Sequence, residues 1–491
     1  MTTSPSDALP DVGADRPFDV AVIGGGPAGM SAAVAAADGG ARVVLVDAGS
    51  ALGGQFWRHP PDRALAAEVA GQHHDLRRYR RLATAIAEHE RAGRLVARLR
   101  HEVWTLGRDG AGFVVRAIDR GAVEPTEQVL RAGRLVLAPG AYDRQVPFPG
   151  WTLPGVMTAG GVQALLKGSG TVAGQRVLVA GTGPFLLPVA AGLASAGATV
   201  VGVHEASGAT GWAQHPMPVL RNASKLSEGA GYAATLARHR VPYRLRSTVL
   251  EAHGDDELRE VTVARLDRDG HVRPGSERRV AVDVLAVGWG FTPQLELPLA
   301  LGCATRVDTD GSLVVIVDDE QRTNVDGVYV AGEACGVGGA ALAAVEGRIA
   351  GAAADAGPTA ARPARDRRER AALRAFAAAM HRTYPVPAAW MDRVRDDDLV
   401  CRCEEVPVGL LREVVDDLGA HDPRSAKLMA RVGMGWCQGR VCGYAVACLV
   451  ARWTGTEPDQ AQLATRPVAT PVPLGALGPG ADATLDGPGA M

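Results

Sequence analysis

The sequence has very little lysine, few aromatic residues and no long uncharged apolar run. Lysine occurs three times, at Lys167, Lys225 and Lys427, so arginine supplies nearly all of the positive charge. The 52 basic residues are balanced by 54 acidic residues, and this near neutrality gives none of the basic excess expected of a protein that binds nucleic acid or anionic membranes. Because no run of about 18 uncharged apolar residues is present, no membrane-spanning segment is expected.

No secretion signal is expected either, because residues 1–17 lack a basic start followed by an apolar stretch. We therefore expect a cytoplasmic protein, and disulfide bonds are rare in that compartment. Of the seven cysteines, five lie after residue 400. In a long cytoplasmic chain, such a cluster indicates a metal site rather than a disulfide framework.

Two stretches of the sequence show the pattern of a βαβ unit. They lie at 18–47 and 174–205, and each has an apolar strand, a glycine turn, an alanine-rich helix and a second apolar strand. With 491 residues, the chain is long enough for two to four domains of roughly 100–200 residues each. The predicted fold is therefore α/β, with two Rossmann-like dinucleotide-binding domains and a small C-terminal helical module.

Composition gives the expected domain boundaries. Residues 355–364 are rich in proline and alanine and mark a linker, and the residues from Ala461 on include few large apolar side chains. We expect a flexible N-terminus at 1–17, a first nucleotide-binding domain at 18–168 and 281–354, a second at 169–280, a linker and helix at 355–398, a cysteine-rich domain at 399–455 and a flexible tail at 456–491.

Gly24, Gly26 and Gly29 form the G-x-G-x-x-G fingerprint of a dinucleotide site. They stand after a strand and open a helix, which is the context that the fingerprint requires. The first glycine permits a tight turn, the second lets the backbone approach a pyrophosphate, and the third lets the helix pack on the strand. Asp47 ends the next strand, where a carboxylate can accept hydrogen bonds from a ribose.

Later segments indicate that this dinucleotide is FAD. Residues 323–333, TNVDGVYVAGE, resemble the second flavin signature of two-dinucleotide-domain flavoproteins, in which a strand ends in glycine followed by an acid. Gly332 and Glu333 take those places, with glutamate where aspartate is usual, and the acid is expected to reach the ribityl or pyrophosphate part of FAD. The helix that starts near Ala340 would direct its N-terminus toward the flavin. The loop 138–140 resembles the middle signature of the same proteins.

The second βαβ unit has an altered fingerprint. Gly181 and Gly183 supply the turn, and Glu205 ends the following strand, where a carboxylate favours NAD over NADP. However, Leu186 occupies the third glycine position and Pro188 interrupts the start of the helix, which would push the helix off the strand. The sequence leaves two interpretations open: a site for NAD or another adenine nucleotide, and a retained fold whose site is weak, altered or empty.

Four cysteines near the C-terminus are spaced as ligands of a cluster. Cys401-x-Cys403 is followed by Cys437-x4-Cys442. In an extended segment residues i and i+2 point the same way, so the first pair can bind one iron of a 2Fe–2S cluster and the second pair the other. Structural zinc is the alternative, although its paired ligands usually follow a C-x2-C spacing. The remaining cysteines fit no metal spacing and are expected to be structural: Cys303, Cys335 and Cys448.

Taken together, the motifs resemble the FAD-binding subunits of bacterial amine and amino-acid dehydrogenases. The segments that carry the resemblance are GGQFWR (53–58), VGWGFTP (287–293), AGEACGVGGAALAAVEGRIAG (331–351), CRCEE (401–405) and GMGWCQGRVC (433–442). They look like the FAD-binding subunits of opine oxidases, of hydrogen cyanide synthase and of dye-linked proline and hydroxyproline dehydrogenases. The cysteine module resembles the bacterioferritin-associated ferredoxin domain.

This resemblance implies a heteromeric complex that oxidises a C–N bond in an amino acid, opine, hydroxyproline or glycine. A companion flavoprotein subunit would carry the substrate site, a small ferredoxin-like subunit is a further expected partner, and this type of subunit would pass electrons onward. The resemblance also places Gln55 and Arg58 near the flavin. The candidate FAD contacts are Gly24, Gly26, Pro27, Ala28, Gly29, Asp47, Gly54, Gln55, Arg58, Val103, Ala138, Gly140, Gly332, Glu333 and Ala340.

Two other hypotheses remain open. The first is a self-sufficient NADH-dependent reductase that reduces its own cluster or an external acceptor through FAD, and Glu205 favours it. The second is a non-catalytic scaffold whose cofactor sites stabilise a partner subunit. Dithiol chemistry at the flavin is not expected, because only Cys303 and Cys335 lie before residue 400. The sequence nominates no general base for a substrate amine.

Overall fold

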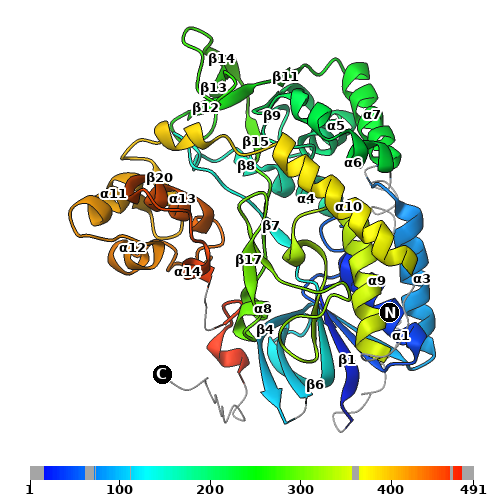
Figure 1. Cartoon of the computed structure of the whole chain (residues 1–491). Coiled ribbons are helices and arrows are strands. Elements are labelled where there is room, and N and C mark those ends of the chain that lie inside the picture. Colours follow the sequence, from blue (N-terminus) through cyan, green and yellow to red (C-terminus); the bar gives the residue numbers. More distant parts are fainter. Residues whose placement is uncertain are drawn as a thin grey trace, which may run out of the picture.

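The computed structural model describes residues 16–60, 71, 73–110, 112–356, 364–464 and 468–477. Figure 1 shows two α/β domains, one above the other, with a small helical module at their side. The predicted α/β class with two Rossmann-like sheets is confirmed. Most of the predicted flexible N-terminus at 1–17 lies outside the described residues.

The first domain is built on a mainly parallel sheet. Its strands are β1 (Phe18–Ile23), β2 (Val43–Asp47), β3 (Leu95–Leu99), β4 (His101–Asp109), β5 (Gly112–Asp119), β6 (Thr126–Leu137) and β19 (Val328–Val330). The order in the described part of the chain is β3-β2-β1-β6-β5-β4, and β19 also pairs with β6. Val20 of β1 lies opposite Val43 and Arg134 in parallel register. Strands β1 and β2 are nearly continuous apolar runs because both faces of this part of the sheet are buried.

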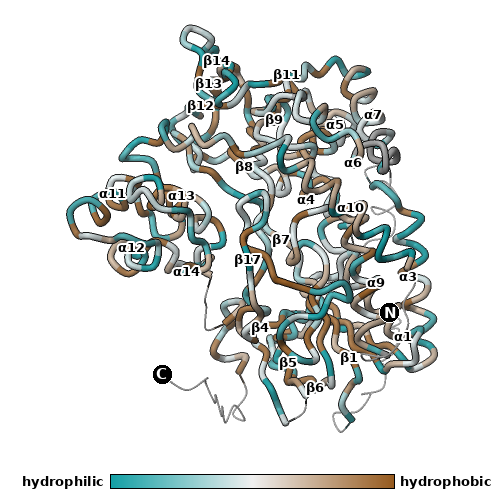
Figure 2. The backbone as a smooth tube through the Cα atoms, in the orientation of Figure 1, coloured by the Kyte–Doolittle hydropathy of each residue, from teal (hydrophilic) through white to brown (hydrophobic). Residues whose placement is uncertain are grey.

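Two helices rich in alanine and glycine pack against each other on this sheet, α1 (Pro27–Gly39) and α9 (Ala340–Ala356). A Cβ on Gly347 would lie 2.0 Å from the carbonyl oxygen of Ala28, and one on Gly351 would lie 2.1 Å from that of Ala32. Only glycine fits at these contacts, so the two helices run side by side (Figure 1). Figure 2 shows the hydrophobic strands around β1 and β6 and the more hydrophilic outer helix α3 (Leu76–Arg91).

The second domain is built on a parallel sheet. Within the described residues its strands are β8 (Val156–Thr158), β9 (Arg176–Gly181), β10 (Thr199–Glu205), β11 (Tyr243–Leu245) and β15 (Val284–Gly288). They follow the order β11-β10-β9-β15-β8. The helices that flank the sheet are α4 (Ala159–Ser169), α5 (Leu186–Ser195) and α7 (Ala223–Arg238).

The predicted boundaries between the two domains, at 168 and 281, need correction. They assign β8 and β15 to the first domain, but Leu285 of β15 lies opposite Val156 of β8 and Leu178 of β9 in the second sheet. The chain first crosses between the domains at residues 138–155, a segment rich in proline and glycine that the predicted boundaries did not use.

These crossings form a short antiparallel ribbon of β7 (Ala141–Asp143) and β16 (Phe291–Pro293) between the domains. The ribbon is followed by α8 (Glu296–Ala300) and the hairpin of β17 (Thr305–Val307) and β18 (Leu313–Val315). A separate antiparallel meander consists of β12 (Ser247–His253), β13 (Glu260–Arg265) and β14 (Arg278–Ala281). The short helices η2 (Ala209–Gln214) and α6 (Pro216–Arg221) follow β10.

A long helix, α10 (Ala364–Thr383), packs on α9 and leads through η5 (Ala388–Asp392) to the cysteine module (Figure 1). The elements of the module are β20 (Leu399–Cys401), β21 (Val406–Pro407), α11 (Val408–Asp416), α12 (Pro423–Ala430) and α13 (Gly443–Thr454). Val400, Leu411, Val446 and Leu449 form the centre of its apolar core. The same buried cluster also includes Leu266 and Trp289, so the core of the module continues into the second domain.

The predicted flexible tail at 456–491 is corrected for its first part. Residues 456–464 and 468–477 are described and include the short helices α14 (Ala461–Ala464) and η6 (Leu474–Ala476). The amide of Ala469 donates a 2.8 Å hydrogen bond to the carbonyl oxygen of Trp104, so this segment returns to the first domain at β4. None of the described helices combines the length and the apolar character needed to cross a bilayer.

Candidate functional site

The glycine turn of the first domain connects β1 to α1. Gly24 has a φ of +104°, and a Cβ there would lie 2.2 Å from the carbonyl oxygen of Ala138, so only glycine is tolerated. A Cβ on Gly29 would lie 1.6 Å from the carbonyl oxygen of Gly24. At Gly26, by contrast, the nearest described atom to a Cβ would be the Cα of Gly54 at 3.9 Å. The turn therefore leaves a space beside Gly26 that fits a pyrophosphate, at the start of α1 formed by Pro27 and Ala28.

The loop with sequence GGQFWR packs directly on this turn. The amide of Gly53 donates a 2.8 Å hydrogen bond to the carbonyl oxygen of Gly25, and a Cβ on Gly54 would lie 2.8 Å from the Cα of Gly26. The guanidinium of Arg58 donates to Oε1 of Gln55 at 2.9 and 3.1 Å. The structure thus brings Gly54 against the glycine turn, and Gln55 and Arg58 follow it in the same loop.

Asp47, the predicted ribose ligand, ends β2 beside the same turn. Its carboxylate accepts hydrogen bonds from the backbone amides of Gly25 and Gly49. The side chain stays partly exposed, so the carboxylate has room for a further donor. Val103, another candidate contact, is buried in β4 among the apolar core of the first domain.

The second flavin signature lies on the other side of α1. Gly332 has a φ of +82° and packs so closely on α1 that a Cβ would lie 3.1 Å from the Cβ of Ala28. The Glu333 carboxylate accepts hydrogen bonds from the amides of Gly339, at 2.9 Å, and Gly338, at 3.3 Å. Burial raises the pKa of Glu333 to about 7. Glu333 thus caps the start of α9 at Ala340, an arrangement that the sequence did not predict. Ala138 and Gly140 follow β6 at the edge of the glycine turn.

The turn of the second domain repeats the first only in part. A Cβ on Gly181 would lie 1.8 Å from the carbonyl oxygen of Gly288, and a Cβ on Gly183 would meet no described atom within 4 Å. However, α5 begins only at Leu186, whereas α1 begins directly after Gly26. The late start moves the first amides of the helix away from the position that a pyrophosphate would occupy.

Glu205, the predicted ribose ligand of the second domain, is fully buried and already hydrogen-bonded. Oε1 accepts from the hydroxyl of Thr182 at 2.9 Å and from the amide of Ser207 at 2.8 Å, and Oε2 accepts from the amide of Gly183 at 2.8 Å. The Tyr243 hydroxyl adds a further hydrogen bond. Burial raises the pKa of Glu205 to about 7, although these hydrogen bonds oppose the shift.

Residues that follow α10 cover this carboxylate. Oγ of Ser207 donates to the carbonyl oxygen of Pro385 at 3.4 Å. The neighbouring Tyr384 accepts a 3.1 Å hydrogen bond from Nε1 of Trp212 and lies close enough to Glu205 to interact with it electrostatically. The carboxylate at the end of β10 is therefore enclosed by the protein's own groups, although the turn itself stays open at Gly183.

The structure brings the four predicted cluster cysteines together. Sγ of Cys403 lies 3.9 Å from that of Cys401 and 3.7 Å from that of Cys437, and the thiols of Cys401 and Cys442 are hydrogen-bonded to each other. That bond lowers the pKa of Cys401 to about 5. Among the described residues, no group of three or more His, Cys, Asp or Glu side chains is arranged to hold a metal ion.

Backbone groups surround these sulfur atoms. The amide of Gly433 donates to Sγ of Cys401 at 3.5 Å, and a Cβ on Gly435 would lie 2.6 Å from Sγ of Cys403. Cys401 and Cys442 are buried, whereas Cys403 is exposed, as is the side chain of Trp436, which is 82% exposed. The quartet thus has a buried edge toward the protein and an open edge toward solvent. The other cysteines are buried away from it: Cys303, Cys335 and Cys448.

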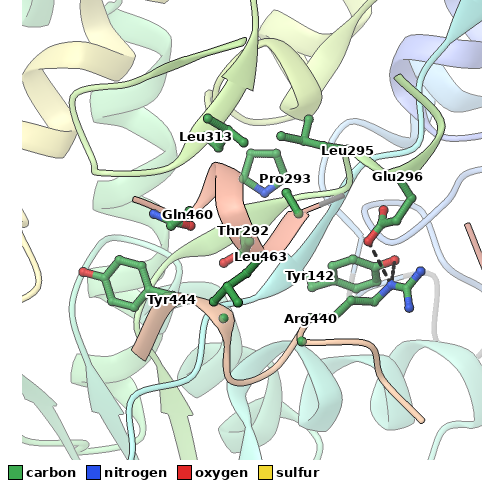
Figure 3. A pocket seen from close by; sticks show the side chains of 13 residues that line it. Tyr142, Thr292, Pro293, Leu295, Glu296, Leu313, Arg440, Tyr444, Gln460 and Leu463 are labelled. Atoms are coloured by element: carbon green, nitrogen blue, oxygen red, sulfur yellow. Dashed lines mark hydrogen bonds and ion pairs between the residues drawn. The ribbon is translucent and has the colours of Figure 1, made fainter. Parts of the chain in front are cut away.

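Sequence reasoning missed the contact between the cysteine loop and the first domain. Figure 3 shows Arg440, which stands between Cys437 and Cys442, directed toward Tyr142 of β7 and Glu296 of α8. Its Nε lies 2.8 Å from the Tyr142 hydroxyl and 3.0 Å from Oε1 of Glu296. A cavity of about 50 Å³ adjoins these side chains, which is room for water rather than for a substrate. The only signal in the sequence was an arginine inside the C-x4-C motif.

Comparisons with known proteins agree with this architecture. The pyridine nucleotide-disulphide oxidoreductase family matches residues 18–354. Hydrogen cyanide synthase subunit HcnB of Pseudomonas protegens is 32% identical over 469 residues, covering 93% of this chain and 97% of that protein. The A-subunit of opine oxidase from Rhizobium meliloti is 31% identical over 476 residues, covering 93% and 98%.

Among solved structures, L-proline dehydrogenase from P. horikoshii has a TM-score of 0.64 at 20% identity, covering 94% of this chain and 79% of that one, and this likeness concerns the fold alone. The resemblance inferred from the motifs is confirmed by the relatives, and the family match supports FAD as the cofactor of the first domain. The chain belongs to the pyridine nucleotide-disulphide oxidoreductase family and is a flavin-dependent oxidoreductase related to HcnB and to the A-subunit of opine oxidase.

Proposed function

We propose that this chain is the electron-transferring subunit of a heteromeric dehydrogenase that oxidises a C–N bond in an amino acid, opine, hydroxyproline or glycine. It would carry FAD in the first domain and a 2Fe–2S cluster in the cysteine module. The observation that carries the proposal is the gathering of four cysteine thiols, from two distant segments, next to a flavin-type domain. The names of the relatives, an opine oxidase and a hydrogen cyanide synthase each built from subunits, support the class of reaction and the subunit role.

The residues of the first domain fit FAD. The open space at Gly26 would receive the pyrophosphate, the amides at the start of α1 would face its charge, and Asp47 would accept from the ribose. Gln55 and Arg58 would border the flavin from the loop packed on the turn. FAD supplies the ability to take up two electrons and to release them one at a time.

The four cysteines fit a 2Fe–2S cluster. Cys401 and Cys403 would bind one iron, and Cys437 and Cys442 the other, so each iron requires only two thiolates. The Gly433 amide, already bonded to Sγ of Cys401, would help to set the reduction potential. A structural zinc ion would instead require all four thiolates to surround one point.

The arrangement of Glu205 argues against the self-sufficient NADH reductase. The Glu205 carboxylate accepts from Thr182, Ser207 and Gly183 and is fully buried, so neither of its oxygens is exposed to a ribose. The substrate site would then belong to a companion flavoprotein subunit, and a small ferredoxin-like subunit would serve as a further partner. The open edge at Cys403 is where electrons would leave or enter.

The test is an anaerobic visible spectrum of the purified chain, recorded before and after NADH, together with iron and acid-labile sulfide analysis. We expect flavin and iron–sulfur absorption that NADH leaves unchanged and that dithionite bleaches. Bleaching by NADH would support the self-sufficient reductase instead. Bound zinc without iron would contradict the cluster. A flavin that only dithionite reduces, even when the companion flavoprotein and its substrates are present, would support the scaffold.

A further inference from the structure

Arg440 connects the cysteine loop to the segment that leaves the flavin site. Its Nη1 donates a 3.1 Å hydrogen bond to the carbonyl oxygen of Cys437, and its Nε donates a 2.8 Å hydrogen bond to the Tyr142 hydroxyl. Tyr142 stands two residues after Gly140, in the strand that continues the loop 138–140. Two consecutive hydrogen bonds therefore lead from the backbone of Cys437 to Tyr142, and Figure 3 shows the second of them.

The surroundings of Arg440 hold its side chain in one orientation. Glu296, which is 6% exposed at its side chain, forms an ion pair with the guanidinium at 3.0 Å, and the carbonyl oxygen of Ala469 accepts a further hydrogen bond. Tyr142 is held in turn by the ribbon, where it lies opposite Thr292 of β16. A guanidinium held by these partners is pre-organised, so little further conformational entropy is lost when it holds the two loops together.

A second arginine–tyrosine pair crosses the same interface without touching the cysteine loop. The guanidinium of Arg144 lies 4.3 Å from the ring centroid of Tyr444 on α13, and it pairs with Asp310 at 2.8 Å. This pair attaches the module to the first domain through the helix after Cys442. The attachment of the module therefore does not depend on Arg440 alone, which separates the role of Arg440 from simple docking.

We propose that Arg440 and Tyr142 are positioning residues for electron transfer between FAD and the cluster, a proposal that rests on the proposed function. They hold the cysteine loop against the flavin loop and provide the connected path between them. The step moves one electron from the reduced flavin to the oxidised cluster. No covalent bond between heavy atoms forms or breaks, the proton released by the flavin passes to water, and the second electron follows once a one-electron acceptor has reoxidised the cluster.

The test uses the full chain loaded with FAD and iron. Laser-flash reduction of the flavin, followed by the absorbance change of the cluster, gives the rate of internal electron transfer. Tyr142→Phe keeps the ring and the packing but removes the hydroxyl that Arg440 bonds, and Arg440→Lys keeps the charge but loses the planar fork. Tyr444→Phe is the matched control, because its ring faces Arg144 and its hydroxyl bonds Cys448 rather than the cysteine loop.

We expect Tyr142→Phe to keep the FAD content, the iron content and both midpoint potentials of the parent, with the transfer rate reduced roughly ten-fold. Arg440→Lys is expected to slow the transfer in the same direction, and Tyr444→Phe to leave it unchanged. A parental rate in Tyr142→Phe would overturn the inference while leaving the proposed function intact, and so would a rate loss fully explained by shifted potentials. A parent chain without iron or FAD would overturn the proposed function itself.

Discussion

The amide of Gly183 donates a 2.8 Å hydrogen bond to Oε2 of Glu205. Asp47 makes the corresponding bond to Gly25 in the first domain but remains partly exposed, whereas Glu205 is fully buried. The two dinucleotide turns of the chain therefore share a backbone design and differ in whether the acid at the strand end is accessible. In the second turn, that acid serves as a structural contact.

The burial of Glu205 predicts a pH-dependent stability. Its pKa of about 7 in the folded chain lies above the ordinary value of 4.5, so the folded state holds the proton more tightly than the unfolded state. The free energy of unfolding should therefore fall as pH rises from about 4.5 to about 7. The Glu205→Gln side chain does not titrate, so the variant should not show this fall. As pH rises from about 4.5 to about 7, the free energy of unfolding of the variant should therefore increase relative to that of the parent by up to about 3 kcal/mol.

Urea unfolding of both proteins at pH 5 and pH 8 checks this expectation. Glu257→Gln, at an exposed carboxylate, is the control and should show no such change relative to the parent. A Glu205→Gln protein whose stability parallels that of the parent at both pH values would mean that Glu205 stays ionised in the fold.

The space beside Gly26 predicts a selective loss of flavin. A Cβ there would meet no described protein atom closer than the Gly54 backbone, so Gly26→Val should fold, but its side chain would occupy the approach of the pyrophosphate. We expect the affinity for FAD to fall roughly hundred-fold, which is about 3 kcal/mol. The measurement is the FAD content and the dissociation constant, with circular dichroism as the check of folding.

Gly107→Val is the matched control for this change. Gly107 lies in β4 of the same domain, and a Cβ there also meets no described atom within 4 Å. It should retain the parental affinity for FAD. Full yellow colour in Gly26→Val would place the cofactor elsewhere.

The cysteine quartet predicts that each of its four cysteines is essential for binding iron. Cys437→Ser should lower the iron content from about two per chain to a small fraction of that, because a 2Fe–2S cluster needs four thiolates. Cys448→Ser is the control, since that thiol is buried on α13 and bonds Tyr444. Iron and acid-labile sulfide are measured by chemical analysis and the cluster by electron paramagnetic resonance after reduction. Equal iron in both variants would contradict the assigned ligands.

The exposed side chain of Trp436 predicts a contact with an electron-accepting protein. It lies next to Cys437 and is 82% exposed, so its removal should change the free energy of unfolding by less than about 0.5 kcal/mol. Trp436→Ala should raise the KM for a ferredoxin acceptor roughly ten-fold, because exposed aromatic residues often dominate protein contacts. Reduction of ferricyanide, which needs no docking surface, should stay at the parental rate. If ferredoxin and ferricyanide respond alike, Trp436 does not lie at the docking surface.

Short sequence motifs predicted those parts of the site whose residues lie close together in the chain. The positions of Gly24, Gly26 and Gly29 follow from a strand, a turn and a helix that are adjacent in the sequence. The gathering of the cysteines followed from ligand spacing. In contrast, the sequestration of Glu205 depends on Tyr243 and on the segment after α10, and no sequence spacing relates residues that meet only in the folded chain.

The same reason explains the remaining corrections. Strands β8 and β15 belong to the second sheet because they pair with each other and β15 pairs with β9, and no pattern within these short strands assigns them to that sheet. Arg440 bonds Tyr142, which lies 298 residues earlier in the chain, and an arginine within a C-x4-C motif does not predict that partner. The C-terminal segment around Ala469 has few large apolar side chains. It is attached to β4 through a backbone hydrogen bond, which side-chain composition does not predict.

The cover over Glu205 also has a consequence for biosynthesis. Ser207 and Glu205 leave the ribosome well before Tyr384 and Pro385, so a nascent chain completes its second Rossmann-like sheet while the turn is still uncovered. Glu205 is enclosed only when α10 has been synthesised, and the cysteine module follows directly after it. Enclosure of Glu205 and arrival of the four cysteines thus belong to the same late stage of synthesis.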